Sequence, residues 1–364
     1  MGKEGIAVYI HIPFCLKKCD YCDFYSLRYE EGRARAFALA LLEEIHSYTN
    51  LQAKTIYIGG GTPTSLPTPL LKDIILQAKA HFSLPPQNEL TVEANPETLD
   101  EKMLQSLKEV GVNRLSIGVQ SFNDELLSFL GRVHNASKAR WAIRKAKEIG
   151  FENINIDLLF AIPRQSLEDW QTTLEEAISY QPTHISCYSL TFEKGTKLHR
   201  KLKTGEISPP DEENSALMFE MADEILTSNR YIHYEISNYA LPGYECQHNL
   251  SYWRSEPYLG LGPSAVSFLP PYRLRNPTLP KYLNGQKAKL EEIVDEKGRR
   301  KEKLMLGLRL REGVAKSLLA AKIPEELIEG GFIEEVGERI RLTLKGMLVY
   351  NRIVADLFFG GGDF

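Results

Sequence analysis

Short apolar or alternating runs recur along the first half of the chain. They are AVYIHI, TIYIGG, LTVEAN, RLSIGVQ, INIDLLF and HISCYSL, at residues 7–12, 55–60, 90–95, 114–120, 154–160 and 184–190. Runs of this length that are bounded by turn residues are typical of strands. Amphipathic stretches with apolar residues at helical spacing separate them, at residues 33–48, 68–82, 100–110, 137–150 and 167–180.

The regular alternation of strand and helix predicts an α/β fold with a parallel sheet and right-handed crossovers. Six such units favour a barrel, complete or open, over a sandwich. We therefore expect residues 1–235 to form a partial (β/α)6 barrel. Such a barrel binds its ligands at the carboxyl ends of the strands, so polar residues at those ends become the candidates for a site.

The pattern changes after about residue 230. Residues 236–296 are rich in aromatic residues, proline and glycine, which predicts loop-rich connecting material. Helical patterns return at Lys297, and Ile340, Leu342 and Leu344 then alternate with polar residues after a glycine-containing turn. Helices followed by a hairpin resemble a winged helix, so we expect a small winged-helix-like α+β domain at residues 297–364.

Composition and charge indicate a globular protein that is not expected to bind nucleic acid. Of 364 residues, 43% are hydrophobic and 25% are charged, which is typical of a globular chain, and the formal net charge is −4. Nucleic acid is therefore not an expected partner. The slight basic excess of residues 297–364 is too small to indicate DNA binding, so we interpret that domain as a lid or a docking site for a partner.

The sequence predicts a cytoplasmic protein. No apolar run approaches the roughly 18 residues that a membrane-spanning helix needs, which leaves only peripheral contact with a membrane open. The first fourteen residues contain Glu4 and lack the apolar centre and cleavage site of a secretory signal. Thiols stay reduced in the cytosol, so clustered cysteines there indicate a metal or catalytic site rather than disulfides.

Three of the five cysteines, Cys15, Cys19 and Cys22, lie within eight residues. This spacing lets one tight loop point three thiolates at a common centre. Iron–sulfur clusters are held in this way, usually by four cysteines. Phe24 occupies the position where another cysteine might follow, so one iron could be left open to a ligand from outside the protein.

Other interpretations of the cysteines remain open at this point. A structural zinc ion could use the three thiolates with His11 or Cys246 as its fourth ligand, although zinc sites more often combine two separated pairs. A reduced thiol cluster without metal is a further alternative. Cys187 lies within the sixth apolar run and is expected to belong to the core.

A glycine turn, Gly59–Thr64 (GGGTPT), follows the second expected strand. Glycines allow the backbone to approach a ligand closely, although a turn at a strand end is often only a turn. The sequence has neither the lysine of a P-loop nor the glycine pattern of a dinucleotide site. Polar residues that could share the barrel mouth with this turn, each of which could alone be structural, are Glu93, Gln120, Arg132 and Asp157.

With these features in this order, the chain resembles the radical S-adenosylmethionine (SAM) enzymes. The resemblance is strongest to the oxygen-independent coproporphyrinogen III oxidases and their relatives, the HemW-type heme chaperones. It extends from about Tyr9 to the C-terminus and is carried by YIHIPFC, GGGTPT, RLSIGVQSF and HNLSYW.

The resemblance implies a cofactor site. Cys15, Cys19 and Cys22 would bind three irons of a [4Fe–4S] cluster, and SAM would chelate the fourth iron. An electron from a low-potential donor would pass through the cluster and cleave SAM to methionine and a 5′-deoxyadenosyl radical. The resemblance also implies contacts with SAM from Tyr9, Tyr21, Gly60, Gly61, Thr62, Glu93, Gln120, Arg132 and Asp157.

Two departures from the oxidases, and one shared element, favour the chaperone branch. The oxidases have a further cysteine where this chain has Phe24, and a longer arm before the cluster loop. The chaperone branch also has the element found here as HNLSYW. The resemblance implies heme contacts from its members His248, Asn249, Tyr252 and Trp253.

His248 in this element could have either of two roles. Histidine is a common axial ligand of heme iron, and aromatic side chains can wall a heme site. A buried packing histidine is the alternative for His248, and Cys246 is a second candidate ligand.

Three functions are therefore expected in order of preference. The first is a heme chaperone that delivers heme to apoproteins such as membrane-bound respiratory enzymes. The second is an anaerobic coproporphyrinogen III dehydrogenase, in which the radical abstracts hydrogen from propionate side chains. The third is a binding module stabilised by zinc.

Overall fold

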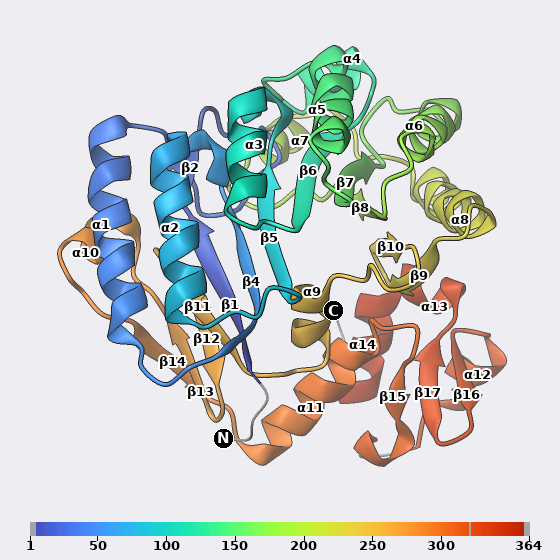
Figure 1. Cartoon of the computed structure of the whole chain (residues 1–364). Coiled ribbons are helices and arrows are strands. Elements are labelled where there is room, and N and C mark those ends of the chain that lie inside the picture. Colours follow the sequence, from blue (N-terminus) through green and yellow to red (C-terminus); the bar gives the residue numbers. More distant parts are fainter. Residues whose placement is uncertain (1–4, 320–321, 360–364) are drawn as a thin grey trace.

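A twelve-stranded sheet dominates the structure, which is a computed structural model that describes residues 5–319 and 322–359 (Figure 1). Its central strands, all parallel, occur in chain order. They are β1 (Ile6–Ile12), β4 (Ala53–Gly60), β5 (Glu89–Ala94), β6 (Arg114–Gln120), β7 (Asn153–Phe160) and β8 (His184–Ser189). The predicted strands and their parallel order are confirmed.

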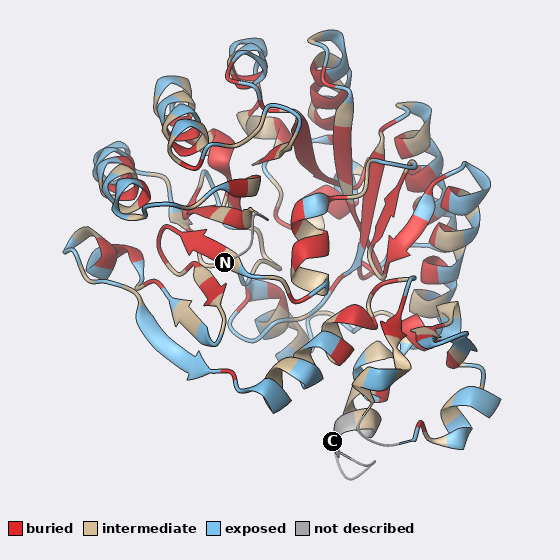
Figure 2. Cartoon of the chain, turned by 60° about the horizontal axis from the view of Figure 1, so that its bottom comes forward, coloured by how far each residue is buried: buried red, intermediate tan, exposed pale blue. Residues whose placement is uncertain are grey.

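Helices connect these strands and cover the outer face of the sheet. They are α1 (Glu31–Ser47), α2 (Thr68–His81), α3 (Glu101–Glu109), α4 (Asp124–Phe129), α5 (Ala136–Glu148) and α6 (Leu167–Ser179). Local sequence fixes where several begin: Asp100 accepts a hydrogen bond from the amide of Met103, and Ser166 and Asp169 form a capping box. The predicted partial barrel is therefore confirmed, and Figure 2 shows the exposed outer faces of its helices.

The strands separate an apolar outer layer from a polar interior. On β4, Ile56 and Ile58 belong to the apolar core that the helices cover, whereas Thr55 and Tyr57 alternate with them and make polar contacts. Successive side chains of a strand point to opposite faces, so this alternation places hydrogen-bonding groups inside the barrel. The interior is therefore suited to polar ligands.

Residues 236–296 extend the sheet, so the expectation of loop-rich connecting material is wrong. The segment contains β10 (Asn238–Ala240), α9 (Gln247–Trp253), β11 (Tyr258–Leu261), β12 (Val266–Leu269), β13 (Tyr272–Arg275), α10 (Leu279–Leu283) and β14 (Lys289–Ile293). These strands have only three to five residues each and lie among prolines and glycines. They are too short to show a clear alternation of apolar and polar residues. Their stability comes from pairing with neighbours, as β11 pairs with β1 in parallel.

The sheet also runs across the predicted boundary at residue 235. Strand β9 (Ile232–Glu235) pairs with β10, and β10 pairs with β8, in both cases antiparallel. Between β8 and β9 the chain forms α7 (Lys197–Lys203) and α8 (Glu212–Ser228). The domain boundaries themselves stay a prediction.

A small C-terminal domain follows the large sheet, as predicted. It contains α11 (Glu296–Gly307), β15 (Val314–Ala315), α12 (Glu325–Glu329), β16 (Ile333–Val336), β17 (Arg339–Leu342), α13 (Leu344–Leu348) and α14 (Tyr350–Phe359). The predicted hairpin is β16–β17, within a three-stranded sheet of order β15, β17, β16. Leu344 does not continue the strand, because the Thr343 side chain caps a new helix at that point.

No helix in the described part of the chain is both long enough and apolar enough to cross a membrane.

Candidate functional site

The three clustered cysteines lie on one loop that the fold anchors at several points. The loop leaves β2 (Phe14–Cys15) and returns at β3 (Leu27–Arg28), and these two short strands pair in parallel. In its middle, the amide of Asp20 donates to the carbonyl of Leu130 at 3.0 Å, and the carbonyl of Asp20 accepts from the amide of Leu198 at 2.9 Å. The loop is thus held from two other parts of the barrel.

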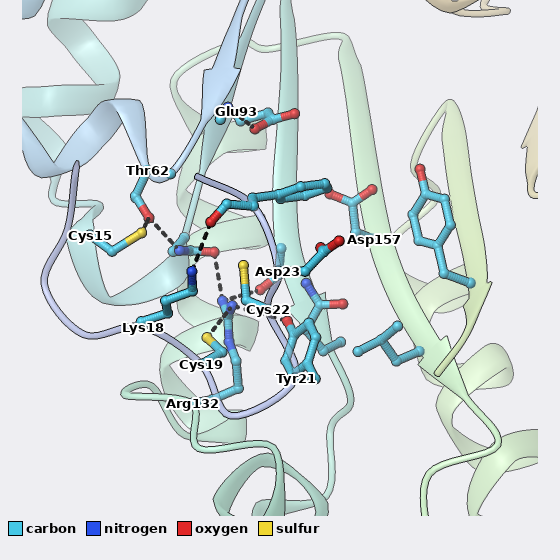
Figure 3. A pocket seen from close by; sticks show the side chains of 18 of the residues that line it. Cys15, Lys18, Cys19, Tyr21, Cys22, Asp23, Thr62, Glu93, Arg132 and Asp157 are labelled. Carbon is cyan, nitrogen blue, oxygen red and sulfur yellow. Dashed lines mark hydrogen bonds between the residues drawn. The ribbon is translucent and has the colours of Figure 1, made fainter. Parts of the chain in front are cut away.

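The loop forms one wall of a cavity of about 500 Å³ at the carboxyl ends of the parallel strands (Figure 3). Of the nine predicted SAM contacts, eight line this cavity with all three cysteines. Those eight are Tyr21, Gly60, Gly61, Thr62, Glu93, Gln120, Arg132 and Asp157. The structure therefore brings together residues that are up to 142 positions apart between Cys15 and Asp157.

Tyr9 is the exception, because it does not line the cavity. Its side chain lies inside the barrel beside His11, with 3.1 Å between the Tyr9 hydroxyl and the His11 Nδ1 atom. The other ring nitrogen of His11 bonds the carbonyl oxygen of Tyr25 at 2.8 Å. A contact between Tyr9 and SAM stays a prediction; the Tyr9 ring lies 6.2 Å, between centroids, from the ring of Tyr57, which lines the cavity.

Neither proposed fourth zinc ligand is placed to complete a zinc site with the cysteine loop. Both ring nitrogens of His11 are already engaged, and Cys246 is 3.4 Å from Glu89 at the other end of the barrel, where β5 begins. Within residues 5–319 and 322–359, no three histidine, cysteine or acidic side chains converge on a single-ion site. A tetrahedral zinc ion needs such convergence, whereas the ligands of a cubane cluster each bind a different iron.

The cysteine sulfurs receive hydrogen bonds from the cavity wall. Thr62 Oγ1 donates to Cys15 Sγ at 3.5 Å, and Arg132 Nη1 donates to Cys19 Sγ at 3.4 Å. Burial raises the pKa of Cys15, and it raises the pKa of Cys22 to about 11, so these thiols are protonated at neutral pH. Metal binding would displace those protons, and the two donors would then stabilise the thiolates.

Asn95, which the sequence analysis missed, connects the two sides of the cavity. Its Nδ2 donates to Thr62 Oγ1 at 2.8 Å, and its Oδ1 accepts from Arg132 Nη2 at 2.6 Å. Asn95 follows β5 directly, so the rule that selected Glu93 from strand ends would also have selected it. Glu97, two residues later, lies 3.9 Å from the same Arg132 Nη2 atom.

Glu93 points its carboxyl group into the cavity from β5. Its Oε1 accepts from the Tyr57 hydroxyl at 2.7 Å, and its Oε2 accepts from the amide of Gly60 at 3.0 Å. Burial is the largest influence on this carboxyl group and raises its pKa to about 7. A side chain at Gly59 would place its Cβ within 2.8 Å of the carboxyl group, so any other residue there would displace that group.

Asp157 is a second buried carboxyl group on the cavity wall. It accepts hydrogen bonds from Ser116 Oγ at 3.0 Å and from Asn155 Nδ2 at 2.8 Å. Burial raises its pKa despite these bonds. Gln120, at the end of β6, has a φ of 67°, a left-handed conformation that turns the chain at the cavity edge.

The chain matches the radical SAM superfamily over residues 9–177 and the HemN C-terminal domain over residues 294–349. It is 36% identical to the heme chaperone HemW of Lactococcus lactis, over 96% of this chain and 92% of that protein. The heme chaperone HemW of Escherichia coli is 34% identical, over 97% of this chain and 98% of that protein. The chain belongs to the HemW family of radical SAM proteins.

A solved structure has the same overall fold. The radical SAM enzyme coproporphyrinogen III oxidase (HemN) from Escherichia coli superposes with a TM-score of 0.84, covering 98% of this chain and 90% of that chain. At 23% identity this likeness concerns the fold alone. The resemblance stated from the sequence is therefore confirmed.

The HNLSYW element of this HemW family member lies away from the cysteine loop. It forms α9, at the lower ends of β4 and β5 in Figure 1, and none of its four predicted heme contacts lines the cavity. His248 and Tyr252 lie inside the barrel, Trp253 stacks 4.3 Å from the guanidinium of Arg309, and Asn249 is half-buried. A heme contact by these residues stays a prediction.

An Asn95→Ala substitution is expected to weaken SAM binding about tenfold, because it leaves Arg132 and Thr62 without their shared partner. Equilibrium dialysis of the anaerobically reconstituted protein measures the affinity. Asn88→Ala is a matched control, since Asn88 bonds the carbonyl of Lys54 before β5 begins, at the other end of that strand. Equal SAM affinity in the Asn95 and Asn88 variants would contradict the role given to Asn95.

Proposed function

We propose that the protein is a heme chaperone that binds heme and transfers it to apoproteins. The observation that carries this proposal is the match to proteins named heme chaperone HemW along nearly the whole chain. Two details of the molecule support it. The cofactor residues of a radical SAM protein gather in one cavity, and the loop that holds the cysteines carries Phe24 instead of a fourth cysteine.

A [4Fe–4S] cluster and SAM are the proposed resident cofactors. The three thiols share one wall of the cavity, with hydrogen-bond donors at two of the sulfurs, which fits the ligand set of a cluster with one open iron. When bound, the cluster would supply one electron to the sulfonium of SAM.

The cavity wall offers partners for each part of SAM. Arg132 can pair with its carboxylate, and Glu93 and Asp157 can bind its ammonium or ribose hydroxyl groups. Gln120 offers an amide, and Gly60 and Gly61 allow the backbone to approach.

Apolar side chains at the cavity rim support a flat, apolar cargo there. Phe24 is 64% exposed, Tyr188 is 38% exposed, and both line the cavity mouth. Leu16, next to the first cysteine, is 43% exposed. Exposed apolar side chains beside a cavity suit an apolar ligand, and aromatic rings stack well on a tetrapyrrole.

We also propose which proteins receive the heme and where in the cell this occurs. Apoproteins of respiratory type would receive heme, with peripheral membrane contact, and a low-potential donor would reduce the cluster. The cytoplasm is the proposed location because all five cysteines are free thiols, as expected in a reducing compartment.

Coproporphyrinogen III dehydrogenation is the second candidate, favoured by the fold shared with coproporphyrinogen III oxidase. Anaerobic incubation of the reconstituted protein with heme and, separately, with coproporphyrinogen III and SAM distinguishes the two. We expect stoichiometric heme binding and no vinyl groups. Chromatography detects vinyl products, and the heme Soret band reports binding. Turnover of coproporphyrinogen III to a vinyl-bearing product would overturn the chaperone assignment.

A further inference from the structure

The HNLSYW helix α9 presents different side chains to two parts of the molecule. His248 and Tyr252 are four residues apart, so they share one face of the helix, and this face closes the lower end of the barrel. Trp253 lies on another side, where it belongs to an apolar cluster with Tyr234 and Leu310. Only the first face can influence the interior of the barrel directly.

His248 is fully buried, and both of its ring nitrogens have partners. Nδ1 is 2.9 Å from Thr55 Oγ1, and Nε2 is 2.9 Å from the Tyr252 hydroxyl. Burial, with smaller effects from Lys54 and Arg114, lowers its pKa to about 3, so the ring is neutral. Neither nitrogen is free to ligate iron in this arrangement.

The His248 ring reaches the cofactor cavity through one intermediate residue. It stacks on the ring of Tyr57, with 5.0 Å between centroids and 28° between planes. Tyr57 lines the cavity, and its hydroxyl donates to Glu93 Oε1 at 2.7 Å. One side of the Tyr57 ring is thus fixed by α9, while its hydroxyl fixes a carboxyl group that faces the cofactor.

We propose that the HNLSYW element positions the SAM site: His248 holds Tyr57, and Tyr57 holds the Glu93 carboxyl group in its orientation toward the cofactor. His248 and Tyr57 are positioning residues in this arrangement. The inference rests on the proposed function, in which Glu93 contacts SAM. It assigns to His248 a task other than the heme contact predicted from the sequence.

The surroundings of Glu93 allow the Tyr57 bond to be measured separately. The Tyr57 hydrogen bond lowers the pKa of Glu93, and so do the Gly60 amide and the charge of Arg114, whereas burial and Asp157 raise it. Loss of the hydroxyl group should therefore shift the ionisation of Glu93 to higher pH. The other titratable groups that interact with Glu93 are Tyr9 from β1, Tyr188 from β8 and Tyr252 from α9.

The test compares SAM affinity, its pH dependence and heme binding in the anaerobically reconstituted full chain. We expect Tyr57→Phe to weaken SAM binding about tenfold and to raise the pH at which binding is half-maximal. His248→Ala should weaken SAM binding to a similar degree and leave the heme spectrum and affinity unchanged. The control is Gln247→Ala, because Gln247 is exposed on the same helix and bonds only the carbonyl of Glu245 among its described side-chain partners.

Two conservative variants, one of them additional, protect the test against misfolding. Tyr57→Phe and Tyr252→Phe each remove a single oxygen atom, and Tyr252→Phe should weaken SAM binding by a smaller factor than His248→Ala. Wild-type SAM affinity and pH midpoint in Tyr57→Phe would overturn the inference, and so would loss of heme binding in His248→Ala with SAM affinity retained. If the wild-type chain bound SAM but no heme, only the proposed function would fail; if it bound no SAM, both would fail.

Discussion

A Cys19→Ala variant is expected to lose the iron–sulfur cluster altogether. Cys19 is the middle residue of the three-thiol loop, and its sulfur accepts a hydrogen bond from Arg132 at 3.4 Å. With two thiolates left, a cubane would expose a second iron to solvent in a loop that offers no further thiol. Iron and acid-labile sulfide should fall at least tenfold after anaerobic reconstitution, and the charge-transfer absorbance should disappear.

The control for this variant removes a different cysteine. Cys187 lies on β8, is 4% exposed and does not line the cavity, so Cys187→Ala should retain the full iron content. The paramagnetic signal of the reduced cluster should likewise persist in that variant. Full iron and sulfide in Cys19→Ala, or equal losses in both variants, would contradict the ligand assignment.

The barrel could be predicted from sequence because its signals are local. Each parallel strand is a short apolar or alternating run, and the helices between them repeat at 3.6 residues, so period alone identifies both. The cavity followed from one topological rule, that parallel strands present their carboxyl ends at the same edge. Glu93, Gln120 and Asp157 were found in this way.

The parts that the sequence did not predict depend on contacts distant in the chain. Strand β11 forms because β1, some 250 positions earlier, offers a parallel edge, and no local period marks it. The position of α9 also depends on distant contacts. The sequence HNLSYW indicates which chemical groups the helix carries but not whether they are buried. Only its packing against Thr55 and Tyr57 places His248 inside the barrel and away from the cysteine loop.

The polar interior of the barrel depends both on local strand patterns and on contacts that are distant in the chain. The carboxyl groups that the strand ends supply are buried, and burial opposes their ionisation. Glu93 and Asp157 accordingly both have raised pKa values. A cationic cofactor would offset that cost, so the cavity is arranged at some expense of stability in the cofactor-free chain, as is common at binding sites.

A Glu93→Gln variant should therefore be more stable than the wild type and yet fail to bind SAM. Burial raises the pKa of Glu93 from an ordinary value of 4.5 to about 7. A carboxyl group whose folded pKa lies above its unfolded value lowers stability as pH rises from the unfolded pKa through the folded pKa, and the full cost persists at higher pH.

This rise in pKa corresponds to about 3 kcal/mol, so the cofactor-free variant should gain on the order of 1–3 kcal/mol near pH 8 and less than about 1 kcal/mol near pH 5. Glutamine can keep bonds to Tyr57 and Gly60 but has no charge to attract an ammonium group, so SAM affinity should fall at least tenfold. Urea unfolding at both pH values and equilibrium dialysis measure the two effects. A variant that is less stable than the wild type near pH 8 would show that the buried Glu93 carboxylate does not lower stability, and a variant that binds SAM normally would show that it does not contact the cofactor.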